Sequence, residues 1–169
     1  MARKVLVLAD IRNDKLRNVT FESLNAARKI AEGGEVYGAL LGKGVAGLAD
    51  SLAHYGADKV FVVENEVLAN YVPDAYAKAL EAVVRESGAE VVLMAHSAIG
   101  RDLAPKLAAR FEAGQVSDII DVQVEGGKVV FARPIYAGKA FTRNVIGEGM
   151  IFATVRPNNL PAAEPDTSR

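Results

Sequence analysis

The sequence predicts an α/β fold in three layers, with a mainly parallel sheet between helices and an antiparallel extension near the C-terminus. Four short aliphatic runs in the first two thirds lack two-residue alternation, which is typical of strands buried on both faces of a parallel sheet. Segments with helical spacing separate these runs. After Gly114 the pattern changes to a period of two, which indicates antiparallel strands.

The four predicted parallel strands are residues 5–9, 36–41, 59–63 and 91–95. A first helix follows a Thr20 cap, and it places Phe21, Leu24, Ala27 and Ala31 on one face. A second helix has Val45, Leu48 and Leu52 on one face and ends before Gly56.

The third helix begins near Pro73 and stops at Gly88, which agrees with the capping preferences of proline and glycine. The fourth helix is predicted to begin near Arg101, because Pro105 is tolerated in a first turn.

The antiparallel extension begins with a hairpin whose strands are residues 120–125 and 128–136. Gly126 and Gly127 supply the positive φ angles of a tight primed turn between them. Further strands are predicted at residues 140–146 and 150–155. We expect one domain over residues 1–156. The proline-containing polar residues 157–169 are predicted to be a truncated interdomain linker or tail.

Composition excludes several classes of function. The 169 residues suit one domain, and 20 basic against 21 acidic residues argue against nucleic acid as a partner. The absence of cysteine excludes disulfides and thiolate chemistry, and two histidines are too few for most metal sites, so no metal is expected. No apolar run is long enough for membrane insertion. Because a strand begins near the start of the chain, no signal peptide is expected, and the predicted location is cytoplasmic.

Ligands of open parallel sheets bind at strand ends where the winding direction reverses. If the first and fourth strands are neighbours there, the loop at residues 10–13 and the loop at residues 96–101 face one crevice. Asp10, Ser97, Gly100 and Arg101 are then candidates for an anion or nucleotide loop, helped by the positive end of the following helix. The alternative interpretation is that Ser97 and Gly100 only cap and turn into that helix.

Other chemical signals are weaker. No hydrolase Gly-x-Ser-x-Gly motif and no Walker or dinucleotide glycine motif occurs, and no catalytic residue is predicted. His96 lacks a matched nucleophile or carboxylate in the sequence and is interpreted as a packed, hydrogen-bonded residue. A basic bias on the C-terminal strands indicates either an anionic cofactor or partner, or a solvated strand face. Its residues are Arg133, Lys139, Arg143 and Arg156.

Specific segments resemble the N-terminal domain of the electron transfer flavoprotein alpha subunit, over residues 3–157. These are the opening VLVLAD, GRDLAPKLAARF at 100–111, FARPIYAGKAFTRNVI at 131–146 and TVRP at 154–157. Lys139 departs from the asparagine that is common in the family. The resemblance implies a three-layer Rossmann-like fold of the adenine nucleotide alpha-hydrolase-like type.

The resemblance also implies an alpha/beta heterodimer that carries electrons through FAD, from dehydrogenases such as acyl-CoA dehydrogenases towards a quinone oxidoreductase and the quinone pool. The family binds FAD mainly in a C-terminal alpha domain that this sequence does not contain, and it binds AMP in the beta subunit. This chain alone is therefore expected to be redox-silent. Arg133, Pro134, Tyr136 and Gly138 become candidates for contact with beta. The mitochondrial matrix is the expected location if a presequence has been removed.

Three function classes follow from these observations. The first is a noncatalytic scaffold and assembly domain of an electron carrier. The second is a standalone nucleotide-binding module that uses Asp10 and the loop from Ser97 to Arg101. The third is an enzyme such as an adenylating ligase or pyrophosphatase, which the absence of a Ser-Gly-Gly-x-Asp-Ser phosphate loop argues against.

Overall fold

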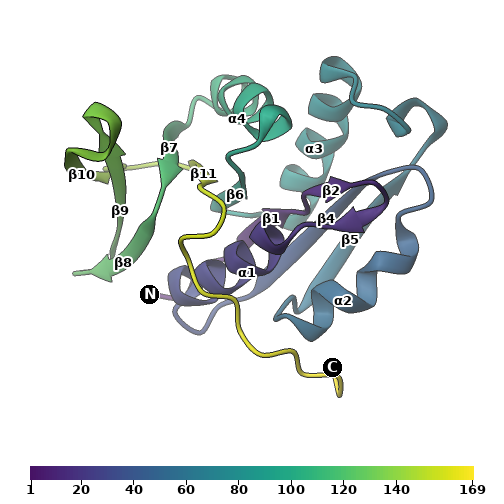
Figure 1. The fold of residues 1–169 in the computed structure, drawn as a ribbon, viewed down its shortest axis with the longest axis horizontal. Helices are drawn as coiled ribbons and strands as arrows, with labels where there is room; N and C mark the ends of the chain where they lie inside the picture. The colour runs from purple at the N-terminus through teal and green to yellow at the C-terminus, as the bar shows by residue number, and fades with distance from the viewer.

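The computed structural model describes residues 1–169 and confirms the predicted three layers (Figure 1). The central sheet consists of β1 (Val5–Leu8), β4 (Val36–Gly42), β5 (Lys59–Glu64), β6 (Val91–Ala95), β7 (Gly114–Ile119) and β11 (Ile151–Val155). Its strand order is β5-β4-β1-β6-β11-β7, and every neighbouring pair is parallel. The chain therefore winds outward from β1 in one direction and then returns to continue from β6 in the other.

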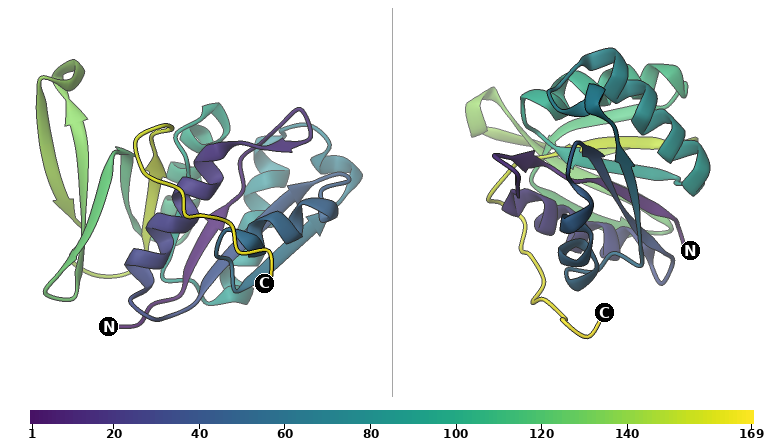
Figure 2. Two further views of the ribbon diagram at one scale, coloured as in Figure 1. Left: turned by 60° about the horizontal axis from the view of Figure 1, so that its bottom comes forward. Right: turned by 90° about the vertical axis from the view of Figure 1, so that its right-hand side faces the viewer.

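Helices cover both faces of this sheet, as the edge-on view in Figure 2 shows. The helices are α1 (Asn18–Ala31), α2 (Ala49–His54), α3 (Pro73–Ser87) and α4 (Ala98–Arg110). Consecutive strand residues point to opposite faces. Val5 and Val7 accordingly pack in the core beneath α1 and α2, whereas Leu6 and Leu8 pack in the core beneath α3 and α4. Both faces of β1 are thus fully covered, which explains its unbroken aliphatic sequence.

Two predicted helix starts are wrong. The first helix begins at Asn18, with Arg17 at the N-cap, and Thr20 lies buried in its first turn, where its hydroxyl accepts a hydrogen bond from Asp10 N. The fourth helix begins at Ala98, a turn earlier than predicted. Pro105 consequently lies inside α4, on its exposed side, where water can reach the carbonyl group that loses its helical partner.

The other two helices agree better with the sequence. The third begins at Pro73 and ends at Gly88, whose φ of 66° is left-handed, as predicted. The second is divided into a 3₁₀ turn, η1 (Ala46–Leu48), and the short α2. A further 3₁₀ turn, η2 (Glu66–Leu68), follows β5.

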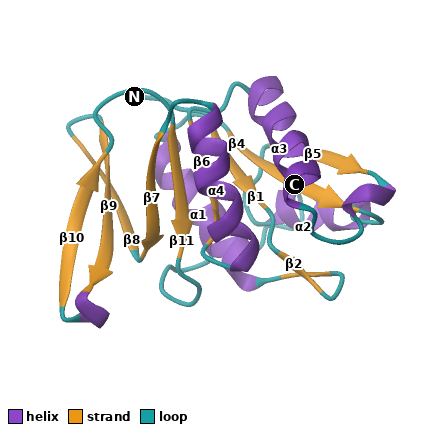
Figure 3. Ribbon diagram, turned by 90° about the horizontal axis from the view of Figure 1, so that it is seen from above, coloured by secondary structure: helices purple, strands orange, loops and turns teal.

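A second sheet projects beyond β7 at one end of the molecule (Figure 3). We call it the arm, and it consists of β8 (Asp121–Glu125), β9 (Lys128–Ile135), the 3₁₀ turn η3 (Tyr136–Gly138) and β10 (Ala140–Val145). Its strand order is β10-β9-β8, with antiparallel pairs. The φ angles of 57° at Gly126 and 77° at Gly127 confirm the predicted primed turn.

Parts of the sheet architecture were not predicted. No strand is predicted at β7, and the strand predicted at 150–155 is not expected in the parallel sheet. In the structure β11 lies between β6 and β7. A two-stranded hairpin of β2 (Ile11–Arg12) and β3 (Lys15–Leu16) also replaces the loop expected after β1.

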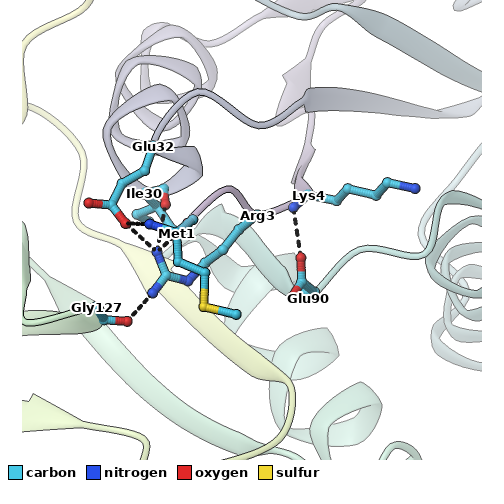
Figure 4. Close-up of polar contacts among 7 residues, drawn as sticks. All are labelled: Met1, Arg3, Lys4, Ile30, Glu32, Glu90 and Gly127. Carbon is cyan, nitrogen blue, oxygen red and sulfur yellow. Dashed lines mark hydrogen bonds and ion pairs between the residues drawn. The ribbon is translucent and has the colours of Figure 1, made fainter.

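The N-terminus ties the arm to the body of the domain (Figure 4). Arg3 Nη1 donates to Ile30 O and pairs with Glu32 Oε2, both at 3.1 Å, at the end of α1. Arg3 Nη2 donates to the carbonyl oxygen of Gly127 in the turn of the arm. The Met1 ammonium group pairs with the same Glu32 at 2.8 Å. These contacts fix the β8–β9 turn against α1.

Residues 157–169 form no helix or strand and pass over α1 towards α2 (Figure 2). The backbone nitrogen of Asn158 donates to buried Glu22 at 2.9 Å, and Asn25 donates to the carbonyl oxygen of Pro161 at 3.0 Å. Arg169 pairs with Asp58 at 2.6 Å. The assignment of this segment as a linker stays a prediction. No helix of the chain combines the length and apolar character needed to span a membrane.

Candidate functional site

The loops after β1 and β6 meet at the point where the winding direction reverses. β1 pairs with β4 on one side and with β6 on the other, so the two strands are neighbours as the crevice prediction requires. Ser97 Oγ donates to Asp10 Oδ1 across the gap at 3.1 Å. The topology thus brings together the two loops that the sequence analysis placed at one crevice.

The Asp10 carboxylate is already occupied by groups of this chain. Its second oxygen, Oδ2, accepts from Arg17 Nη1 at 3.0 Å, and only 12% of the side chain is exposed. Ser97 and Arg17 together therefore satisfy the carboxylate, and one guanidinium group balances its charge.

Ser97 and Gly100 perform the structural roles that the alternative interpretation gave them. Ser97 is the N-cap of α4, and its hydroxyl accepts from Gly100 N at 3.2 Å. A Cβ atom at Gly100 would lie 1.8 Å from the carbonyl oxygen of Ala95, so only glycine permits this approach of α4 to β6. Arg101 is exposed in the first turn of α4 and forms no ion pair. Anion binding by this loop stays a prediction.

The enclosed space at these strand ends is small. It measures about 40 Å³ and is lined by Asp10, Ser97, Gly100 and apolar residues of β1 and β6. Two more open hollows adjoin it on either side of the β2–β3 hairpin, with volumes of about 270 and 380 Å³. Tyr71 and Tyr76 line the larger hollow, and burial together with the hydrogen bond to Asp102 raises the pKa of Tyr71. The tyrosines therefore remain neutral at physiological pH.

A second polar cluster lies on the other side of the same loop. His96 Nδ1 is 2.9 Å from Thr154 Oγ1 of β11, and Thr154 is fully buried. The Thr154 hydroxyl also accepts from Asp118 N at 2.9 Å. Because this hydroxyl is buried, its own proton needs an acceptor, and Nδ1 is the one within hydrogen-bond distance. These partners assign the imidazole proton of neutral His96 to Nε2.

Asp118 is the only carboxylate of this cluster. Its φ of 63° is left-handed, and Arg156 Nε and Nη2 bind its two oxygens at 2.9 and 2.6 Å. This bidentate hydrogen bond holds the pKa of Asp118 below its usual value. His96 Nε2 lies 3.9 Å from Asp118 Oδ1, which is too long for a hydrogen bond.

Arginine charge dominates the surroundings of His96. Burial is the main factor that lowers the pKa of His96, and the guanidinium groups of Arg101, Arg156 and Arg133 lower it further against the opposing Asp118. The Nε atom of Arg133 is buried and has no hydrogen-bond partner in the chain. His96 is thus a packed residue, as predicted, but Arg133 does not lie on a fully solvated strand face.

The predicted partner-contact residues lie at the far end of β9 and in η3. Tyr136 and Gly138 are exposed, whereas Pro134 is buried and Arg133 is half-buried. Pro134 pairs with Phe141 of β10, and β8 no longer pairs with β9 at that level. A proline inside β9 is compatible with this one-sided pairing.

Sequence reasoning missed Asp118 and Thr154 as members of a polar cluster. Asp118 falls in an unpredicted strand. Thr154 lies in a predicted strand and is fully buried. A buried hydroxyl needs a hydrogen-bond partner, so a threonine in a buried strand is the one signal that a polar group lies nearby.

A model of the electron transfer flavoprotein domain matches residues 5–169 of this chain. The electron transfer flavoprotein subunit alpha of Bacillus subtilis is 52% identical over 169 residues, which are 100% of this chain and 52% of that protein. The subunit of the same name from Syntrophomonas wolfei is 43% identical over 151 residues, or 89% of this chain and 47% of that protein.

A third relative has a different name. The acryloyl-CoA reductase electron transfer subunit beta of Anaerotignum propionicum is 41% identical over 130 residues, which are 76% of this chain and 35% of that protein. The chain thus spans about half the length, or less, of these curated relatives.

Proposed function

The chain belongs to the electron transfer flavoprotein domain family, and we propose that it is the scaffold and subunit-assembly domain at the N-terminus of an alpha subunit. In this proposal the complete alpha/beta heterodimer carries electrons through FAD, and this domain takes no part in the redox chemistry itself. Its function is to bind the beta subunit and to support the domain that holds the flavin.

The observation that carries this proposal is the set of exposed apolar side chains of the arm. Tyr136 of η3 is 79% exposed, and Phe141 and Val145 of β10 are 63% and 43% exposed. The outer strand, β10, pairs only with β9 and presents a free edge. Soluble domains seldom leave a free strand edge and large apolar side chains unprotected. The free edge of β10 and these side chains therefore favour an interface with another subunit.

The backbone of η3 supports the same proposal. Tyr136 and Ala137 have φ angles of 50° and 53°, which are uncommon for residues with a side chain. Left-handed backbone at such residues costs on the order of 1 kcal/mol each, and it concentrates at functional sites. Here it presents the Tyr136 ring to solvent at the tip of the arm, where a partner can bury it.

The residues of this chain do not fit a flavin. The enclosed space at the strand ends is about 40 Å³, whereas cofactor sites enclose roughly 300–1,000 Å³. The larger hollows of the chain, of about 270 to 450 Å³, are open to solvent rather than enclosed. Asp10 also places a carboxylate where a phosphate group would have to bind. We therefore place FAD outside this domain and propose that this chain alone is redox-silent. AMP in the beta subunit is what the family resemblance implies.

We assign the electron donors and acceptors of the complete protein by class. The resemblance and the name of the acryloyl-CoA reductase relative favour dehydrogenases of CoA thioesters such as acyl-CoA dehydrogenases as partners, with a quinone oxidoreductase as acceptor. Bacterial relatives favour a cytoplasmic location. We assign residues 157–169 to the segment that joins this domain to the rest of the subunit.

The test is association with a beta subunit. The double variant Tyr136→Ser with Phe141→Ser is co-expressed with beta, and its affinity is compared with that of the natural chain by calorimetry. We expect a loss of about 2 kcal/mol or more, or at least about 30-fold in Kd, because large aromatic side chains dominate interface energies.

Val67→Ser is the matched control, because Val67 is 59% exposed and lies in η2, away from the arm. It should bind beta as well as the natural chain does. Equal binding by the double variant, or no binding by the natural chain, would contradict the assembly role.

The visible spectrum of the purified chain tests the proposal that FAD binds outside this domain. We expect no flavin absorbance, and stoichiometric bound flavin would overturn this proposal.

Titration with AMP or ATP tests the alternative of a standalone nucleotide-binding module. Tight nucleotide binding without binding of beta would favour that alternative.

A further inference from the structure

The arm has two outer edges, and they differ in how they are covered. The strand order β10-β9-β8 places β8 at one edge and β10 at the other. Helix α1 packs against β8, where Lys29 Nζ donates to the carbonyl oxygen of Val122 at 3.4 Å. On the other side, no element of the chain pairs with the outer edge of β10. The β8 edge is therefore covered by the domain itself, whereas the β10 edge is free.

β10 lacks the features that usually keep an edge strand from pairing with another chain. Its residues, Ala140 to Val145, pair with β9 in continuous register without a bulge. The strand contains no proline and no lysine, and its one charged residue, Arg143, pairs with Glu125 of β8. Edge strands of soluble domains are commonly protected by proline, bulges, short length or charge. β10 thus presents a regular row of free backbone N–H and C=O groups.

The side chains of β10 add an apolar surface to this edge. Successive strand side chains point to opposite faces, so Phe141 and Val145 share one face of the arm, and both are exposed. A helix packed on this face would bury the two side chains but would leave the edge N–H and C=O groups without partners. Such groups are costly once water is excluded. An added strand satisfies the backbone and places its own side chains beside Phe141 and Val145.

We propose that a strand of the beta subunit adds to the free edge of β10 and extends the arm by one strand. This inference rests on the proposed function, because beta is the partner which that function assigns to the arm. Strand addition takes affinity from main-chain hydrogen bonds and specificity from alternate side chains. The added strand therefore carries apolar residues at alternate positions, where they contact Phe141 and Val145.

The first test is amide hydrogen exchange of the isotope-labelled chain, measured alone and in complex with unlabelled beta. In an antiparallel pair, alternate residues direct their N–H groups towards the partner strand and away from it. Every second amide of residues 140–145 should therefore exchange fast in the free chain. We expect the complex to slow these amides at least about tenfold. If beta binds and they remain fast, the edge is not paired, and this inference is wrong although the assembly role stands.

A proline variant tests the same contact through affinity. The variant is Thr142→Pro or Arg143→Pro, chosen so that the lost amide is the one that exchanges fast in the free chain. Such a proline removes an outward N–H group and leaves the hydrogen bonds to β9 in place. We expect its Kd for beta to rise at least about tenfold.

Alanine at the same position is the matched control, because it removes the side chain and keeps the N–H group. We expect its Kd for beta to rise less than about threefold. Equal losses in the proline and alanine variants would contradict strand addition. If the proline variant does not fold, the exchange measurement on the natural complex decides by itself.

Sedimentation of the chain without beta tests the alternative occupant, a second copy of this chain. We expect a monomer whose mass does not change with concentration. A dimer that the proline variant abolishes would assign the edge to a second copy and overturn the proposal. No binding of beta by the natural chain would contradict the assembly role and this inference together, whereas binding with unprotected β10 amides contradicts this inference alone.

Discussion

Two neighbouring residues of one loop lead to two different kinds of polar site. Ser97 points towards β1 and binds Asp10, whereas His96 points towards β11 and binds Thr154. On the β1 side, one guanidinium group balances one carboxylate and every polar group of that pair has a partner. On the β11 side, Arg133 retains a buried nitrogen without a partner.

The two sides of the loop differ in what predicts them: strand order predicts one, and only the hydrogen-bond partners reveal the other. The winding rule for open α/β sheets points to the β1 side, and the crevice forms there as the rule requires. Its polar groups nevertheless bond to one another and cap α4. The β11 side, which no motif marks, instead retains a buried guanidinium nitrogen of Arg133 without a partner. The following four predictions test this comparison.

Gly100→Ala should cause the largest loss of stability, because the added Cβ would lie 1.8 Å from Ala95 O. α4 would have to move away from β6, and we expect the free energy of unfolding to fall by more than about 3 kcal/mol. Urea unfolding measures it. Gly138→Ala is the control, because an added Cβ at this position would meet no atom within 4 Å. The only cost there is that alanine would have to adopt the left-handed φ of 82°. It should cost about 1 kcal/mol. Equal effects would mean that the close approach at the crevice is not required.

Thr154→Val tests the β11 side with a side chain of similar shape. It removes the hydroxyl that accepts from Asp118 N and bonds to His96, so a partly buried amide proton loses its partner. We expect a loss of about 2 kcal/mol in urea unfolding. Thr142→Val on β10 should change stability by less than about 0.5 kcal/mol, because Thr142 bonds only to the side chain of Asn144.

Ser97→Ala should have a moderate effect on the β1 side. It removes the cap of α4 and one partner of Asp10, and we expect a loss of about 1 kcal/mol in the free energy of unfolding. Ser97→Thr retains a capping hydroxyl and should restore most of that stability.

The smallest expected effect is the pH dependence due to Asp118. Its pKa is lowered in the folded protein, so its ionised form stabilises the fold above pH 3.8, and this contribution is lost as the pH falls through the folded pKa. Because Arg156 is 44% exposed, we expect no more than about 1 kcal/mol.

Asp118→Asn isolates this contribution, since asparagine also tolerates the left-handed backbone. In acid unfolding below pH 4, the variant should lose stability less steeply than the natural chain. Identical slopes would show that the ion pair with Arg156 adds nothing to the stability of the cluster.

Local patterns predicted most of the fold. The four aliphatic runs became β1, β4, β5 and β6, and the glycine pair became the turn of the arm. At α1 the N-cap is Arg17, which makes no side-chain cap hydrogen bond, so no capping signal marked the true start of that helix. The α4 helix begins directly after Ser97, because the Ser97 hydroxyl accepts a hydrogen bond from Gly100 N. As a result, Pro105 lies inside the helix.

The candidate sites divide in the same way. Tyr136 and Gly138 were predicted from their segment and are exposed at the tip of the arm, whereas Pro134 of the same segment is buried. Asp10 and Ser97 were predicted to face each other, and they do. No local signal indicated that they would satisfy each other, because a hydrogen bond between two loops depends on the spacing of β1 and β6.

The sequence by itself determined most of the strands, the existence of the four helices and the layered class, because these depend on side-chain spacing within short segments. Only the tertiary structure decided that β11 enters the sheet between β6 and β7, and that this insertion places Thr154 between His96 and Asp118. These contacts join residues 58 and 36 positions apart. Their geometry is set by how the strands order themselves, and periodicity carries no information about that order.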